Sequence, residues 1–187
     1  MTYNKSIKNT AIFAFTLYML TLFWVLILKC NMRQGIIEFR YTYEGMPLYE
    51  RVVFFMSKFT TTNKNEALMN VVAFIPMGMV VPFIAGKKPY LAATMAGFFI
   101  SLGAELVQLL TAFGGFAYID IINNVLGTLL GIVILCILKR IMTERWLNFG
   151  MTVVSILAIP LLIYALINTI NNIDIYILPP REIINKY

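Results

Sequence analysis

The run ALMNVVAFIPMGMVVPFIA, residues 67–85, contains no charged side chain. As a helix it is long enough to cross a bilayer, which takes about 20 mostly apolar residues at about 1.5 Å of rise each. Four further segments reach a similar length and apolar content: 10–28, 90–113, 118–138 and 149–170. The sequence therefore predicts an all-α, polytopic transmembrane bundle of about five spans, forming a single domain over residues 1–187.

Composition supports a membrane protein. The hydrophobic fraction of 60% exceeds the roughly 45–50% of soluble domains, and only 13% of residues are charged. The net charge of +6 suits contact with anionic lipid, but no basic cluster predicts a nucleic-acid partner. Histidine is absent, and Cys30 and Cys136 form no CxxC pair, so no metal and no cofactor are predicted.

Basic residues in the short loops indicate the orientation. Loop 86–89 contains two lysines, loop 139–148 contains three bases, and loop 114–117 contains none. Because bases favour the cytoplasmic side, we expect a cytoplasmic N-terminus and an extracytoplasmic C-terminus. Loop 29–66, which this scheme places outside, carries six bases and runs against the rule.

Within that loop, residues 48–59 have helical periodicity. Leu48, Val52, Phe55, Met56 and Phe59 fall on one face. The segment predicts a short amphipathic helix, lying on the membrane surface or packed on the spans.

Two spans carry polar side chains at helical spacing, and a third carries one near its start. Glu105 and Gln108 share a face of segment 90–113, and Asp120 and Asn124 share a face of segment 118–138. The two segments run antiparallel, and the rise per residue sets Glu105 level with Asn124, and Gln108 level with Asp120. We predict a ligand-binding cluster just beneath the outer face, made of Asn70, Ser101, Glu105, Gln108, Asp120, Asn123 and Asn124.

The alternative role for these side chains is hydrogen bonding between helices, which suits Asn70 and Gln108 considered alone. Two carboxylates are less easily explained, since charges in a span are costly and usually face a bundle interior or wet cavity. Either amides solvate them, water enters, or a cationic or hydrogen-bond-donating ligand binds. Helix packing is the expected role of the small or kinking residues Gly97, Gly127, Gly131 and Pro76.

Three stretches, NVVAFIPMG (70–78), SLGAELVQ (101–108) and DIINNVLGTLLG (120–131), resemble the VanZ-like family of small bacterial membrane proteins. The resemblance covers about residues 65–135. The family's polar and glycine signature falls on Asn70, Pro76, Gly78, Ser101, Glu105, Gln108, Asp120, Asn124, Gly127 and Gly131. Ala117 and Gly114 stand where the family often has a second acid and an arginine, and EGMPLYE (44–50) keeps little of the family's N-L-x-P-F stretch.

The resemblance implies a role in the bacterial cell envelope, because the family's named member is associated with teicoplanin resistance. We expect a membrane protein that binds a lipid, a lipid-linked cell-wall precursor or a lipophilic glycopeptide. One alternative is a membrane enzyme using Glu105 and Asp120 as an acid/base couple, although no nucleophile motif or phosphate loop supports it. The others are a small transporter and an assembly subunit.

Overall fold

The computed structural model describes residues 5–24, 26, 37, 40–43, 45–57, 64–111, 116–173 and 178. In this part of the chain five helices are long and apolar enough to cross a membrane, which confirms the predicted all-α class and its five spans. The spans are α1 (Lys5–Phe23), α4 (Lys64–Ile84), α5 (Pro89–Thr111), α6 (Tyr118–Ile141) and α7 (Glu144–Asn171). The predicted amphipathic segment contains α3 (Leu48–Ser57); residues 58 and 59 lie outside the described part.

Four of the five spans begin before the apolar segments that predict them, and α1 and α5 end at Phe23 and Thr111, short of the predicted residues 28 and 113. Helix α1 begins at Lys5 rather than residue 10, and α7 begins at Glu144 rather than residue 149. Polar residues at these ends continue the backbone hydrogen bonding in the interfacial region, where water is available. Hydropathy therefore predicts the membrane core of each helix and misses its polar ends.

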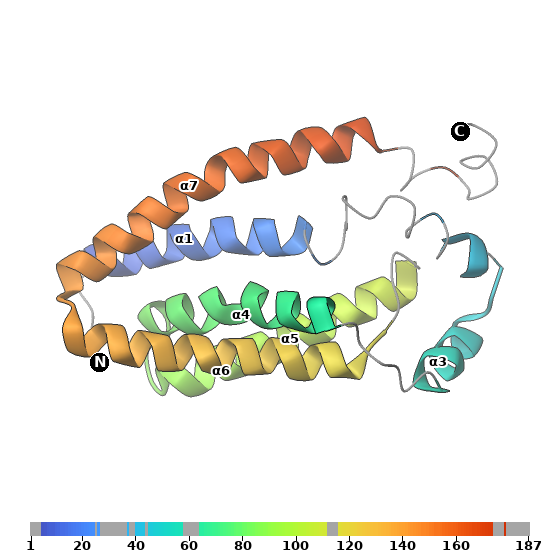
Figure 1. The fold of residues 1–187 in the computed structure, drawn as a ribbon, viewed down its shortest axis with the longest axis horizontal. Helices are drawn as coiled ribbons and strands as arrows, with labels where there is room; N and C mark the ends of the chain where they lie inside the picture. The colour runs from blue at the N-terminus through green and yellow to red at the C-terminus, as the bar shows by residue number, and fades with distance from the viewer. Residues whose placement is uncertain are drawn as a thin grey trace.

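The spans alternate in direction (Figure 1). Helices α1, α5 and α7 finish at the end of the bundle where α4 and α6 begin and where α3 lies, which we call the α3 end. Helices α4, α5 and α6 contact one another, α1 packs against α4, and α7 packs mainly against α1. Helix α7 is thus the most peripheral span.

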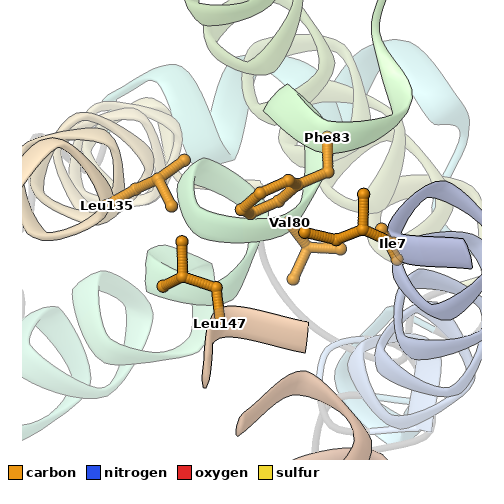
Figure 2. Packing of buried hydrophobic residues seen from close by; sticks show 6 residues of the cluster. Ile7, Val80, Phe83, Leu135 and Leu147 are labelled. Carbon is orange, nitrogen blue, oxygen red and sulfur yellow. The ribbon is translucent and has the colours of Figure 1, made fainter. Parts of the chain in front are cut away.

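A hydrophobic cluster packs the bundle at the opposite end. Figure 2 shows side chains from four helices meeting there: Ile7 of α1, Val80 and Phe83 of α4, Leu135 of α6 and Leu147 of α7. In lipid such contacts stabilise the fold through close packing, since lipid tails are as apolar as the side chains.

Helices α4 and α6 approach at the level of the backbone. A Cβ added to Gly127 would overlap the carbonyl oxygen of Val71, and one added to Gly131 would overlap that of Ile75. From the α4 side, a Cβ added to Gly78 would overlap the carbonyl oxygen of Thr128 in α6. The GxxxG pair therefore packs against α4, at positions that are themselves one turn apart.

Helix α4 continues through Pro76 and Pro82. A proline lacks the N–H for its own turn and crowds the preceding carbonyls, so neighbouring groups must satisfy them. Close to Pro76, the hydroxyl of Tyr18 in α1 donates a 2.9 Å hydrogen bond to the carbonyl oxygen of Ala73. This bond ties α1 to α4 in the turn that the proline weakens.

Candidate polar site at the α3 end

The polar face of α5 is buried in the bundle. Ser101, Glu105 and Gln108 are only 0%, 4% and 3% exposed. They follow each other at intervals of four and three residues, so they lie on one side of the helix. Leu106 and Leu110 on the other side are exposed and face the surroundings of the bundle. The polar side of α5 therefore faces the interior of the bundle and its apolar side faces outward, as expected of a membrane-spanning helix.

Glu105 meets the start of α6. Its Oε2 accepts a 2.8 Å hydrogen bond from the backbone N–H of Ala117, the residue that precedes Tyr118 at the helix start. The first N–H groups of a helix have no partner within it and carry the positive end of its dipole. A carboxylate from a neighbouring helix both accepts a hydrogen bond from a free N–H group and places a negative charge at the positive end of the dipole. Glu105 thus acts as a cap contributed by α5, because Ala117 has no capping side chain of its own.

A second contact joins α5 and α6 deeper in the bundle. The side-chain amide of Asn124 donates a 2.8 Å hydrogen bond to Oγ of Ser101. One turn further along α6, the hydroxyl of Thr128 donates to the backbone carbonyl of Asn124 at 3.0 Å. A Cβ on Gly97 would overlap the Thr128 hydroxyl oxygen, so this glycine lets α6 approach α5. Asn124 and Thr128 are 2% and 0% exposed.

These contacts place Asn124 beside Ser101, whereas the sequence sets it level with Glu105. The count of residues from the connecting loop assumes that the end of α5 and the start of α6 lie at the same depth. In the structure, the glycine contacts with α4 fix how far α6 slides along the bundle. The contact between Glu105 and Ala117 and that between Ser101 and Asn124 are consistent with one antiparallel register.

Gln108 links the site to the end of α1. Its side-chain N–H donates a 3.1 Å hydrogen bond to the backbone carbonyl of Leu26. Its Oε1 is buried and accepts no hydrogen bond from any residue in the described ranges. Within the same ranges, Nδ2 of Asn123 and Oδ1 of Asn124 are also buried without a hydrogen-bonding partner. Most buried polar atoms in folded proteins have a partner, so such atoms call for an explanation.

Two predicted residues lie at the margin of this arrangement. Asp120 is half-buried in the first turn of α6, one turn before Asn124. Asn70 is half-buried on α4 and precedes Val71, whose carbonyl oxygen faces Gly127. In the described part of the chain, Asn70 takes no part in the hydrogen bonds that join Ser101, Glu105 and Gln108 to their neighbours.

Helix α3 is held against this end of α5 by one arginine. The guanidinium of Arg51 donates to the carbonyl oxygens of Tyr43 and Met46, both at 3.1 Å, and to that of Leu110 at 3.4 Å. Leu110 lies in the last turn of α5, where carbonyls lack helical partners and favour a cation. Tyr43 packs edge-on against Phe54 of α3, with ring centroids 5.7 Å apart, and burial raises the pKa of its hydroxyl.

Several of these contacts use groups that sequence reasoning missed. The N–H of Ala117 and the carbonyls of Leu26 and Leu110 belong to the backbone, so no side-chain pattern reveals them. Thr128 did carry a signal, since it lies one turn after Asn124 on the same face. No three side chains of His, Cys, Asp or Glu converge in the described residues, so they provide no metal-ligand set there.

Comparison with known proteins places this arrangement in a family. The model of the VanZ/LLP1 family matches residues 15–139, which include α4, α5 and nearly all of α6. The chain belongs to the VanZ/LLP1 family. Protein VanZ from Enterococcus faecium is a similar relative, 26% identical over 148 residues that cover 79% of this chain and 86% of that protein. No solved structure matches the chain.

The family assignment agrees with the five candidate spans: this is a VanZ-family multi-pass membrane protein. The matched region ends at residue 139, before α7 begins at Glu144. The family part of the chain therefore contains every residue of the polar site but not the peripheral helix α7.

Proposed function

We propose that this VanZ-family protein is a binding protein of the bacterial cell envelope. Its ligand is a membrane lipid, a lipid-linked cell-wall precursor or a lipophilic glycopeptide of the teicoplanin type. The ligand's polar group occupies the site at the α3 end, and its apolar part lies along the spans. The observation that carries the proposal is the group of buried amide atoms on Gln108, Asn123 and Asn124 that have no hydrogen-bonding partner among the described residues.

The energetics favour a ligand over helix packing alone. Leaving a buried donor or acceptor without a partner costs about 1–3 kcal/mol per group. Where one hydrogen bond per side chain is enough for packing, as between Asn124 and Ser101, a hydroxyl side chain would serve. A polar headgroup that completes the remaining bonds offsets the cost and explains why amides occur there.

The proposal includes an orientation with the site outside. The end opposite α3 carries exposed bases in the α4–α5 connection and in the adjoining end turns of α6 and α7: Lys87, Lys88, Arg140 and Arg145. Bases in short loops favour the cytoplasm. The site then lies in the outer leaflet, which is accessible to extracellular drugs and to precursors after their translocation. Glycopeptide resistance follows if the site alters how a lipidated drug reaches its target.

Asn123→Leu tests this proposal, because Leu has the same branched arrangement of side-chain heavy atoms and no polar atoms. If Asn123 only packs, removing its unpartnered Nδ2 leaves stability unchanged or higher, and function intact. If Asn123 binds a ligand, the variant remains folded and loses function. We expect a strain producing the variant to lose teicoplanin tolerance, and the purified variant to lose co-purifying lipid in native mass spectrometry.

The matched control is Ile122→Leu, at the neighbouring position, where the side chain is 46% exposed on the outside of α6. This variant should keep both tolerance and bound lipid. Thermal unfolding in detergent provides the check on folding. Full tolerance and full lipid retention in the Asn123→Leu variant would refute the proposal.

A further inference from the structure

We infer that the end of the bundle opposite α3 binds the phosphate headgroup of an anionic phospholipid, at a second site that does not depend on the proposed function. Six exposed bases lie at this end: Lys5, Lys8, Lys87, Lys88, Arg140 and Arg145. None of the six forms an ion pair with another residue in the described part of the chain. Among the described residues at this end, the only acid is Glu144. The surface therefore carries a large excess of positive charge, which attracts an anionic partner.

The packing of the bundle brings these bases together. Figure 2 shows Ile7 of α1 and Leu147 of α7 in one hydrophobic cluster with side chains of α4 and α6. Lys8 directly follows Ile7, and Arg145 lies two residues before Leu147. Bases from distant segments of the sequence are thereby fixed at one end of a packed structure.

Helix stability explains part of this arrangement. A cation is favourable at the C-terminal end of a helix, and Arg140 lies in the last turn of α6. Lys5 and Arg145 lie instead in the first turns of α1 and α7, where the positive end of the helix dipole disfavours a cation. A bound anion offsets both the dipoles and the charges of these side chains.

Lys88 is the base that membrane topology explains least. Its φ of 52° is in the left-handed region, and it is the one non-glycine residue with a positive φ in the part of the chain that the structure describes. Glycine adopts this region without steric cost, and the following Pro89 restricts the backbone of Lys88 further. Topology needs bases in this short loop, but Lys87 supplies one without such strain. A lysine at the strained position is explained if its ammonium binds a ligand.

The neighbouring apolar side chains favour a lipid over a free phosphate ion. Ile137 and Val133, each 54% exposed, continue the face of α6 that begins at Arg140, at spacings of three and four residues. Trp146 and Phe149 of α7 are both 59% exposed and pack edge-on, with ring centroids 5.9 Å apart. Tryptophan is enriched where the membrane meets water, so these bases lie at the depth of the headgroups. A phospholipid fits with its phosphate at the bases and its acyl chains along α6.

The test compares phospholipids that differ in headgroup charge. Full-length protein in a neutral detergent is incubated with equal amounts of dioleoyl phosphatidylglycerol, which is anionic, and dioleoyl phosphatidylcholine, which has the same phosphate and no net charge. Lipids that the washed protein retains are extracted and measured by mass spectrometry. We expect phosphatidylglycerol to be retained about tenfold more than phosphatidylcholine. High salt should lower this ratio, because the bases are exposed to solvent.

Two substitutions connect the preference to these bases. Lys88→Asn removes a charge and keeps a residue type that tolerates a positive φ, and Arg140→Gln removes a second charge. The double variant should lower the retention ratio by about fivefold. The matched control is Lys64→Gln, which removes an exposed base from the start of α4 at the α3 end and should leave the ratio unchanged.

Lys88→Gly separates lipid binding from folding. Glycine relieves the backbone strain at this position, so the variant should unfold at the same temperature as the original protein or at a higher one. It should nevertheless retain less phosphatidylglycerol. A lysine that is only solvated in the loop would give the gain in stability without the loss of lipid, which would contradict the inference.

Equal retention of the two lipids would overturn the inference, and so would a preference that survives the double variant or that Lys64→Gln lowers equally. Complete displacement of phosphatidylglycerol by an excess of inorganic phosphate would assign these bases to a soluble anion and would also overturn it. The proposed function is tested separately, because Asn123→Leu alters the other end of the bundle and should leave this ratio unchanged.

Discussion

Replacing Gly131 by alanine should separate the two helices that meet most closely. The new Cβ would overlap the carbonyl oxygen of Ile75 and would come within 3.0 Å of its carbonyl carbon and 3.1 Å of Cα of Gly78. All three atoms belong to the backbone of α4, so no side-chain rotation relieves the overlap. The helices themselves must move apart.

The cost can be worked from these contacts. Overpacking by a methyl group in a well-packed region costs about 1–3 kcal/mol. Because all three atoms are backbone, the cost should lie in the upper part of this range, and we expect Gly131→Ala to lower the free energy of unfolding by about 2–3 kcal/mol.

Gly103→Ala is the matched control, because a Cβ on Gly103 of α5 meets nothing within 4 Å. Alanine favours the helix over glycine by up to about 1 kcal/mol, so this variant should be as stable as the original protein or more so. The assay is reversible unfolding of the purified protein in mixed SDS and detergent micelles, followed by circular dichroism. Equal midpoints for Gly131→Ala and Gly103→Ala would refute the reasoning about backbone contact.

Three further substitutions test other contacts. Glu105→Ala removes the carboxylate that accepts a hydrogen bond from the N–H of Ala117, a charge-assisted bond worth about 1.5–3 kcal/mol. Part of this loss is offset because a charge leaves the membrane, so we expect the same unfolding assay to show a net loss of about 1 kcal/mol. An increase in stability would contradict the capping role. Tyr18→Phe removes the hydroxyl that satisfies the Ala73 carbonyl and should cost about 1 kcal/mol in that assay, with an unchanged midpoint as the contrary result. Arg51→Lys leaves a single ammonium in place of a guanidinium that reaches three carbonyls, so hydrogen exchange in α3 should accelerate severalfold while α5 is unaffected; unchanged exchange would show that α3 is held by other contacts.

The sequence predicts the spans well because a bilayer imposes a length that hydropathy can measure. It also predicts which residues share a face, since Ser101, Glu105 and Gln108 follow the helical period. The register between α5 and α6 is a different kind of quantity. This register also depends on where the glycines of α6 pack along α4. A count of residues from the α5–α6 loop takes no account of α4.

The partners of the polar side chains were harder to predict for a second reason. Glu105 and Gln108 bond to backbone groups of Ala117 and Leu26, and every residue has such groups whatever its side chain. A glutamate that caps a neighbouring helix has no sequence signature beyond its position near that helix's start. The close approach predicted from Gly127 and Gly131 does occur, and the structure identifies α4 as the partner helix.

The interlocking of α4 and α6 has a consequence for how a molecule could enter from the lipid. Helices α4 and α6, whose main chains meet at Gly127 and Gly131, cannot separate without losing both contacts, so we expect them to move as one rigid unit. The hydrogen bond from the Tyr18 hydroxyl to the Ala73 carbonyl links α1 to the same pair of helices. In the described part of the chain, the glycines of α5 meet no backbone of another helix: a Cβ on Gly97 would overlap the side chain of Thr128, and one on Gly103 would meet nothing within 4 Å. The last turn of α5 is held by Arg51. Any opening for an acyl chain should therefore form along α5 and not between α4 and α6.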